Sequence, residues 1–588
     1  MGMGLSAQTP DQRLPLLSMT PGPDSLVTGS HAGYRPDCPK RIFIRNSGPG
    51  RMLELSREGS PEPLKQFTID GATNALDPAF RSVSIPGLYG EGRYSVRLAG
   101  GGGPEFSFTT AADVWLRTLQ VLAGYAHRQR CGQSDRVAHP ICHLDDARRR
   151  DTGEHVDVTG GWHDAGDLRK WVDATLMNLF GLAALAGSAG RPAAGTLNPS
   201  ALLDEIKYGN AFFLKMQDAD GLVWADVGGG IHGDNSDNHW TDNQPGTADD
   251  RWIYVEKRPG VQAMFIAAES ITSRLFARVD PPYARRCLDA ALRCWSAGRP
   301  APFREISNTT DLAWAVIAGS ELAAATKAST ICRQAGDLAS RLAATQVEIP
   351  EGARTPVRGF FTMWPGHPEP LRDAVHSAIP AVALLHASQS LGVSLPSESI
   401  RWRSRVRTYI DEYAVPMASF SGYGILPFGL FLDVAPSAKA AERYRSLSSR
   451  YSWRFFMPVT GHAGFSGLNS HLLSHALLFA AAAAAFGDSR YRDLSYAHLE
   501  WVFGANPFGA SLATGVGSNQ PPAFSPFTGL IPGGIMNGIA GNEQDLPVLN
   551  QKSAADWRTN EYWSPHSGYC LWALSLLEGR DARLGAPI

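Results

Sequence analysis

Residues 281–297 read PPYARRCLDAALRCWSA and carry a clear helical signal. Two prolines open the segment, which suits the first turn of a helix because N–H groups have no partner there. Apolar side chains then recur every three to four residues and form one stripe, made by Tyr283, Cys287, Leu288, Ala291, Leu292 and Trp295. We therefore expect an amphipathic helix over 281–297.

Eleven further segments show the same period. With the first, the expected helices are 113–127, 168–187, 200–217, 261–279, 281–297, 310–327, 329–346, 372–390, 397–414, 470–487, 489–504 and 566–578. They tend to come as close pairs. Twelve helices in six hairpins indicate an all-α (α/α)6 toroid, whose inner helices are buried on both faces and whose loops form a cleft at one end. Long connections rich in Gly, Pro and aromatic residues predict ordered loops that line a ligand site; they are 218–260, 347–371, 415–469 and 505–565.

The first part of the chain has a different pattern. Residues 1–30 show no periodicity and predict a disordered tail. Within 31–110, short runs of alternating apolar residues, such as Tyr94, Val96 and Leu98, are separated by turns. This pattern predicts a small all-β immunoglobulin-like sandwich. Because the period changes from two to 3.6 after it, we assign 111–588 to the helical domain.

Composition limits the class of partner. The net charge is −2 and charged residues make up 19% of the chain, which gives no broad attraction for nucleic acid or an anionic membrane. A neutral ligand fits better, and the 15 Trp residues include flat faces that suit sugar rings, although most aromatic residues should lie in the core. Seven cysteines are an odd number, and we expect no disulfide framework. The sequence leaves the oligomeric state open.

Two features bear on where the protein acts. We find no run of about 18 apolar residues and assign the alanine-rich tract 480–485 to an amphipathic helix, so we expect no membrane segment. The N-terminus lacks a charged start followed by an apolar stretch, the pattern of a signal peptide. We expect a cytoplasmic protein, or a secreted one whose leader has been removed.

Residues 160–167, GGWHDAGD, place two carboxylates three residues apart at the mouth of the helix expected over 168–187. Asp164 and Asp167 would share one side of its first turn, where unpaired backbone N–H groups would hold both ionised. Glycine allows close approach of a ligand, and Trp162 offers a flat apolar face. The alternative is that Asp164 only caps the helix and Asp167 is a surface acid.

Two thiols and two imidazoles precede or overlap this motif. They belong to Cys131, Cys142, His143 and His163. Zinc is held tetrahedrally by four such ligands, and a site closed by four protein ligands is structural. The spacing is not that of a zinc finger, so two buried cysteines and two hydrogen-bonded histidines remain the alternative. A metal bound through His163 would fix the backbone that carries Asp164.

These residues resemble glycoside hydrolase family 9, in the cellulase-like branch with an N-terminal immunoglobulin-like domain. The resemblance is carried by residues 129–132, 142–147, 157–167, 203–207, 215–218, 504–509, 514–515 and 560–561. It implies an (α/α)6 fold and inverting hydrolysis of β-1,4-linked glucan. It also implies that Asp167 is the general base, that Asp164 helps to hold the attacking water, and that Glu561 is the general acid.

The resemblance further implies a structural zinc ion on Cys131, Cys142, His143 and His163. Calcium is common in this family, and its candidate ligands here form an acidic loop that could equally be solvated, with Asp234, Asp237, Asp242, Asp249 and Asp250. No ligand set for calcium is assigned.

Inverting hydrolysis needs a protonated carboxyl at the leaving oxygen and an ionised one across the sugar ring. Glu561 is followed by Tyr562 and Trp563, and partial burial beside aromatic rings would favour its neutral form. Without this context, Glu561 would be an ordinary loop acid. Candidate substrate contacts, each with packing as its alternative, are Trp162, Trp557, Tyr562, Trp563, His462 and His566.

One region departs from the family pattern. Residues 517–524 read GSNQPPAF where family cellulases usually have a His-His-Arg stretch that grips substrate. The departure and the absent signal peptide motivate one alternative to an endoglucanase, an exo-acting β-glucosidase or β-glucosaminidase on short oligosaccharides. A non-catalytic glycan-binding protein is a separate alternative of another class.

Overall fold

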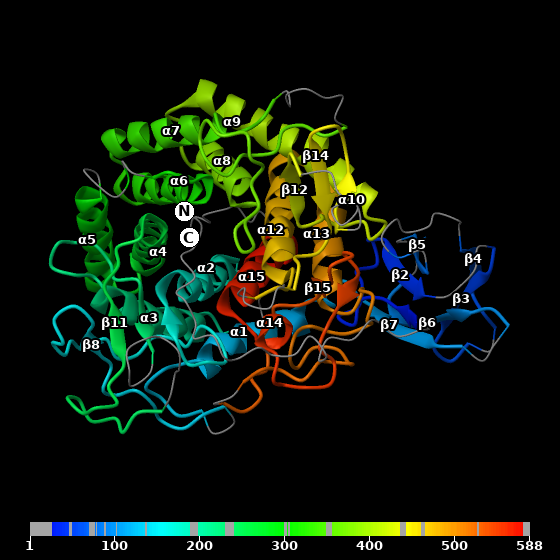
Figure 1. Cartoon of the computed structure of the whole chain (residues 1–588), viewed down its shortest axis with the longest axis horizontal. Helices are drawn as coiled ribbons and strands as arrows, with labels where there is room; N and C mark the ends of the chain where they lie inside the picture. The colour runs from blue at the N-terminus through cyan, green and yellow to red at the C-terminus, as the bar shows by residue number, and fades with distance from the viewer. Residues whose placement is uncertain are drawn as a thin grey trace.

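The structure is a computed structural model. It describes residues 26–579 except 46–49, 61, 70–76, 78, 87–89, 101–102, 136–137, 189–197, 230–239, 299–302, 304–305, 349–355, 435–442, 460–464 and 526–527. A small β domain lies beside a larger helical domain (Figure 1).

The β domain is a sandwich of two antiparallel sheets. One sheet has the order β1-β2-β5, formed by Leu26–Thr28, Lys40–Arg45 and Phe80–Ile85. The other has the order β4-β3-β6-β7, formed by Lys65–Thr68, Met52–Arg57, Gly92–Leu98 and Glu105–Thr110. Side chains alternate strictly between exposed and buried along β7, as a half-buried strand requires. The expected sandwich is confirmed, but it begins with β1, before the expected boundary at 31, and the rest of the expected tail, 1–25, lies outside the described residues.

The helical domain is the expected double ring (Figure 1). Six inner helices contact one another in a closed circle, in the order α2 (Val172–Ser188), α4 (Pro259–Phe276), α6 (Thr309–Thr326), α8 (Ile379–Ser390), α12 (Asn469–Phe486) and α15 (Ser564–Glu578). The paired outer helices are α1 (Leu116–Arg128), α3 (Pro199–Lys215), α5 (Pro281–Ala297), α7 (Ser329–Ala343), α9 (Pro396–Tyr409) and α13 (Ser489–Val502). All twelve predicted helices are present, and the (α/α)6 prediction is confirmed.

The outer and inner helices differ in how much of their surface is buried. On the outer helix α5, the predicted stripe faces inward, with Cys287, Ala291 and Trp295 buried. The inner helix α12 is instead buried on all sides from Asn469 to Ala482, and only its last turn is partly exposed. The expectation of an amphipathic helix there was therefore wrong. α12 is also long and apolar enough to cross a membrane by composition alone, but 78% of its 18-residue window is buried inside the protein.

The long connections hold short ordered elements, as expected. One sheet of order β8-β11-β10-β9 joins Arg148–Arg149, Trp252–Tyr254, Asp226–Gly228 and Lys170–Trp171. A second, of order β12-β14-β13, joins Gly429–Leu432, Tyr451–Arg454 and Arg445–Ser446, and β15 (Ala540–Gly541) pairs with β16 (Pro547–Val548). Short helices are η4 (Ile410–Ala414), α10 (Val415–Phe420) and α14 (Trp557–Asn560).

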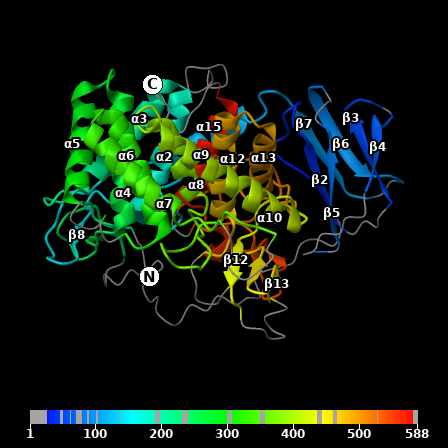
Figure 2. The same ribbon diagram turned by 90° about the horizontal axis from the view of Figure 1, so that it is seen from above.

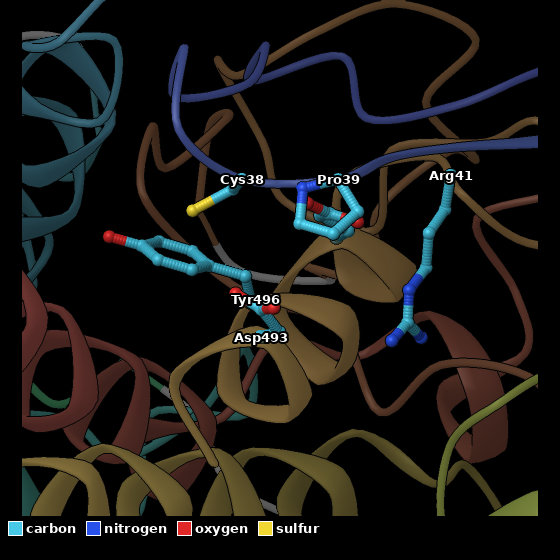
Figure 3. A pocket seen from close by; sticks show the side chains of 6 residues that line it. Cys38, Pro39, Arg41, Asp493 and Tyr496 are labelled. Carbon is cyan, nitrogen blue, oxygen red and sulfur yellow. The ribbon is translucent and has the colours of Figure 1, made fainter. Parts of the chain in front are cut away.

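The sandwich is packed against the toroid on the side of α13 (Figure 2). Phe80 of β5 lies 5.2 Å from the Phe43 ring and 5.2 Å from that of Tyr423, which belongs to the toroid. Where β2 begins, side chains of the sandwich face α13 across a small pocket; Figure 3 labels Cys38, Pro39, Arg41, Asp493 and Tyr496. The two domains therefore share one apolar core at their junction.

Candidate active site

The GGWHDAGD motif lies in a loop and not in a helical turn. α2 begins only at Val172, after the short strand β9. Gly160 and Gly161 have φ values of 86° and 76°, which glycine adopts without strain. The backbone N–H of Asp164 donates to the Arg169 carbonyl at 2.8 Å and closes the loop. The expectation that a helix N-terminus holds the two carboxylates was wrong, because other groups donate to them.

Asp164 is fixed by donors from two distant parts of the chain. Its Oδ1 accepts the backbone N–H of Trp171 at 3.1 Å, and its Oδ2 accepts the indole N–H of Trp563 at 2.8 Å. The carboxyl is 2% exposed. Burial and the neighbouring Asp167 raise the pKa of Asp164 well above its ordinary value, while the two donors act in the opposite direction.

Asp167 is partly exposed and its Oδ1 accepts the backbone N–H of Arg169 at 3.2 Å. Burial raises its pKa, and the positive charges of Arg169 and Arg251 oppose that rise. Of the two aspartates, Asp167 has the better access to a cleft-bound water molecule. Its surroundings therefore suit a general base better than those of Asp164.

Glu561 reaches the same loop because the start of α15 is anchored on it. The Ser564 N–H donates to the Asp164 carbonyl at 2.8 Å, and Ala165 forms an isolated antiparallel bridge with Trp563. α2 and α15 lie side by side in the inner ring (Figures 1 and 2). The GGWHDAGD loop and the segment that carries Glu561, almost four hundred residues apart in sequence, are thus joined in the fold.

The connection after α13 also contacts the GGWHDAGD loop and Glu561. Phe524 forms an isolated parallel bridge with Glu561, and its carbonyl oxygen would lie 2.5 Å from any Cβ at position 166. Only glycine fits at Gly166 without moving backbone. The segment that departs from the family pattern therefore ends directly beside the carboxyl groups.

Burial together with the negative charges of Asp167 and Asp164 raises the pKa of Glu561 well above its ordinary value. The side chain is only partly exposed, and within the described residues its Oε1 has no hydrogen-bond partner. A carboxyl that stays protonated and has an oxygen without a protein partner suits a general acid. The predicted contrast in protonation is not found for Asp164, because burial raises the pKa of that carboxyl well above its ordinary value too.

Three of the six candidate substrate contacts are packing residues. Trp162 is fully buried against Gly209, and its indole N–H donates to Glu205 at 2.8 Å. Tyr562 is also fully buried, with its hydroxyl 2.8 Å from that of Thr528. These two predictions were wrong, because a stacking surface or hydroxyl contact must be open to the ligand.

His566 is the third. Both ring nitrogens are engaged, one with Ser470 at 2.5 Å and the other with Asn537 at 2.8 Å, and the side chain is fully buried. Burial lowers its pKa to about 3, so the ring is neutral. Its prediction as a substrate contact was wrong.

The other three candidates have different outcomes. Trp563 is partly exposed, but its indole N–H is used by Asp164. Trp557, in the first turn of α14, is also partly exposed and stays a candidate for stacking on a sugar. His462 lies outside the described residues.

The four predicted metal ligands meet in one buried cluster. Ligand atoms of Cys131, Cys142, His143 and His163 all lie within 4.8 Å of one another. Cys131 Sγ is 3.6 Å from His143 Nδ1, and Cys142 Sγ is 3.7 Å from His163 Nε2. Zinc–sulfur bonds of about 2.3 Å and zinc–nitrogen bonds of about 2.0–2.1 Å at a tetrahedral angle separate sulfur and nitrogen by about 3.6 Å. The donor set and the spacing fit such an ion.

The cluster is tied to the carboxylate loop. The His163 N–H donates to the Gln129 carbonyl at 2.8 Å, and the Cys131 N–H donates to that of Gly161 at 2.9 Å. Burial favours the neutral thiol of Cys131, but its hydrogen bond with Cys142 and the charge of Lys170 hold its pKa well below the ordinary value. A thiolate at this position is the form that binds metal. All seven cysteines of the chain are buried free thiols.

Only some of the five acidic residues named as candidate calcium ligands lie close together. Asp234 and Asp237 lie outside the described residues, and Asp242 accepts the Gln244 N–H within its own turn. Asp249 and Asp250 form a group with a third residue, Asp145, which was not predicted.

Sequence reasoning also missed the cations around the motif. Arg251 donates two hydrogen bonds to Asp146, and Lys170 Nζ lies 2.5 Å from the same carboxylate, with all three side chains buried. Arg169 pairs with Asp226 in the same way. Lys170 and Arg169 directly follow the GGWHDAGD motif, so their position in sequence was an available signal. Arg251 is about ninety residues away in sequence, so no local pattern indicated its role.

Comparison with known proteins gives a family match for the part of the chain that carries Asp164 and Asp167. The family model described as glycosyl hydrolase family 9 matches residues 118–362. Endoglucanase D of Acetivibrio thermocellus is 29% identical over 226 residues, which cover 34% of this chain and 34% of that protein. The match thus spans about a third of the length of this relative.

Solved structures resemble nearly the whole chain. A metagenome-derived glycoside hydrolase family 9 endoglucanase superimposes with a TM-score of 0.67 at 20% identity, over 95% of this chain and 99% of the other. A zinc-binding triple mutant of another family 9 endoglucanase has a TM-score of 0.66 at 21% identity, over 93% and 100%. At these identities the likeness shows the shared fold, including the sandwich.

Proposed function

Because the chain belongs to glycosyl hydrolase family 9, we propose that it cleaves β-1,4-linked glucan as an inverting endoglucanase. The observation that carries this proposal is the meeting of Asp164, Asp167 and Glu561 at the joined ends of α2 and α15. A binding protein has no need of one buried and one partly exposed aspartate beside a carboxyl whose raised pKa keeps it protonated.

The residues divide the reaction between them. Glu561 gives its proton to the glycosidic oxygen as the bond from that oxygen to the anomeric carbon breaks. A water molecule attacks the anomeric carbon from the other face, and its proton passes to Asp167. Asp164, held by Trp171 and Trp563, accepts a hydrogen bond from the same water and orients it. The product has the opposite anomeric configuration.

Replacing Glu561 by Gln tests the acid. The variant keeps the shape of the side chain but has no proton to give, so kcat on a soluble β-1,4-glucan should fall by roughly 10²–10⁴-fold. Binding of cello-oligosaccharides, measured by calorimetry, should persist. Undiminished turnover would remove Glu561 from the mechanism, and a wild type that binds glucan but never cleaves it would favour the glycan-binding alternative.

An exo-acting enzyme on short oligosaccharides is the second candidate, and one observation favours it. The stretch that replaces the expected substrate clamp is turned toward the sandwich, where the Ser518 N–H lies 3.2 Å from His31 Nδ1. Products from reduced cello-oligosaccharides and chitosan oligomers distinguish the candidates. Release of monomers from one end alone would support the exo-acting enzyme, and mixed internal cleavage would support the endoglucanase.

We also propose that the cluster of Cys131, Cys142, His143 and His163 holds structural zinc. Four protein ligands leave no position for a reacting water, so the ion would brace the loop and take no part in hydrolysis. Metal analysis of dialysed protein should give one zinc per chain, and Cys131→Ser should lose it together with thermal stability. A metal-free preparation with unchanged melting temperature would refute the structural role.

A further inference from the structure

We propose that Phe524 forms one wall of the subsite for the leaving group and selects leaving groups with a flat apolar surface, such as aryl-alkyl alcohols. This inference rests on the proposed hydrolase activity, because the leaving group is defined by the oxygen that Glu561 protonates. It assigns a different kind of recognition to residues 517–524, which stand where family cellulases usually carry a His-His-Arg stretch.

The backbone pairing places the Phe524 ring beside the general acid. Phe524 and Glu561 form an isolated parallel bridge, and the Phe524 N–H donates to the Asn560 carbonyl at 3.1 Å. Residues directly opposite each other in such a pairing project their side chains from the same face. Glu561 must contact the glycosidic oxygen to protonate it, so the group attached to that oxygen passes close to the phenyl ring.

The residues next in sequence show which face this is. Ala523 and Tyr562 each adjoin a member of the bridge and therefore point to the opposite face. Tyr562 is fully buried in a small apolar cluster with Tyr125, and Ala523 packs against that cluster. Phe524 is instead partly exposed and belongs to none of the three apolar clusters of the described residues. The face shared by Phe524 and Glu561 is therefore the open one.

The backbone that carries Phe524 is held in place. The Pro522 carbonyl accepts the side-chain amide of Asn560 at 2.8 Å. The Phe524 carbonyl abuts Gly166, where a Cβ would lie 2.5 Å from it. Pro521 and Pro522 also restrict the backbone before the ring. Because the ring is presented by a fixed backbone, little conformational entropy is lost when a ligand packs against it.

The polar side chains near Phe524 are turned to the backbone. Residues 517–530 contain no Asp, Glu, Lys, Arg or His. The Asn519 side-chain amide donates to the Phe508 carbonyl at 3.0 Å, and that of Gln520 donates to the Val516 carbonyl at 2.9 Å. Apolar contact with the ring, and not hydrogen bonding to hydroxyl groups, then decides the preference for the leaving group.

Two cellobiosides whose leaving alcohols have nearly equal acidity measure the contribution of the ring. Methyl and benzyl β-cellobioside present the same sugars but differ in the apolar surface of the leaving group. We expect the full-length wild type to release benzyl alcohol with a kcat/KM at least roughly tenfold above that for methanol. In Phe524→Ala this preference should fall by roughly tenfold, because the apolar contact with the benzyl group is lost.

Two further variants separate direct contact from indirect effects. Phe524→Tyr keeps the ring and should keep the preference. Phe67→Ala removes a partly exposed phenyl ring from β4 of the sandwich and should change neither rate. An equal loss on both cellobiosides in Phe524→Ala would show that Phe524 only positions Glu561, and would overturn the inference.

The proposed function can fail separately in the same experiment. A wild type that cleaves both cellobiosides without preference, or whose preference survives in Phe524→Ala, would overturn this inference alone and leave the hydrolase activity intact. A wild type that binds both cellobiosides but cleaves neither would overturn the proposed function, and the leaving-group subsite with it.

Discussion

Trp563 acts on the chemistry through a hydrogen bond and not through its ring face. Its indole N–H is one of two donors to the carboxyl of Asp164, and it lies two residues after Glu561. A donor to a carboxylate stabilises the ionised form. We predict that Trp563→Phe raises the pKa of Asp164 further and moves the acidic limb of the kcat/KM profile to higher pH, with a loss of roughly 10-fold at the acid side.

Trp224→Phe is a matched control for that change. Its indole N–H also donates to an aspartate, Asp218, at 3.1 Å, but away from the carboxyl groups of the active site. Both variants remove one N–H and keep an aromatic ring, so both lose some stability. Only Trp563→Phe should displace the pH profile. An equal displacement in the two variants, or none in either, would show that the indole does not control Asp164.

At the scale of single elements, the inner helix α4 carries a buried acid that makes no salt bridge within the described residues. Glu269 of α4 is fully buried, and its Oε1 accepts the side-chain amide of Asn210 at 2.5 Å. Burial raises the pKa of Glu269 from 4.5 to about 8. The folded protein therefore holds a proton that the unfolded chain releases, and the stability this gives is present below pH 4.5 and lost as pH rises toward 8.

We predict that the melting temperature of the wild type falls between pH 5 and pH 8 and that Glu269→Gln removes part of this fall, roughly 2–4 °C. The amide is always neutral, so it loses the linkage and keeps the size of the side chain. A slope remains because Glu500 of α13 is also buried, with a pKa of about 8. Scanning calorimetry at constant ionic strength measures both slopes, and identical slopes would contradict the assignment.

Elements were the part of the fold that the sequence predicted best. The stripe on α5 and the alternation on β7 are local patterns, and local patterns determine which face of a helix or strand is buried. Such patterns could not place α12, since a helix that is buried on every side along most of its length needs no polar face. The same limit applied to Trp162, whose role depends on Gly209 across the packed interface with α3.

The three carboxyl groups of the candidate active site were named from the sequence, but the groups that support them were not. Asp164, Asp167 and Glu561 belong to specific motifs, and the structure brings them together. The donors to Asp164 include Trp563, 399 residues away, and no local pattern connects positions so distant. The loop conformation of residues 160–171 was also missed, because a short sequence with small residues suits a helix start and a tight loop equally well.

For the whole molecule, the question is whether sandwich and toroid are separate folding units. Cys38, Phe43 and Phe80 of the sandwich belong to the main core of the toroid, not to the core of the sandwich itself. Arg35 adds an ion pair with Glu578 of α15 at 2.8 Å. Domains that share an apolar core should unfold together, so we predict one calorimetric transition for the intact chain.

Phe80→Ala and Val83→Ala test this coupling from one strand. Phe80 faces Tyr423 of the toroid, whereas Val83 faces the sandwich's own core. Phe80→Ala should cost about 3–5 kcal/mol and separate the transition into two, because it removes a central apolar contact of the core that the two domains share. Val83→Ala should lower the melting temperature while the transition stays single. Two transitions in the wild type, or a single one in Phe80→Ala, would show that the shared core does not couple the domains.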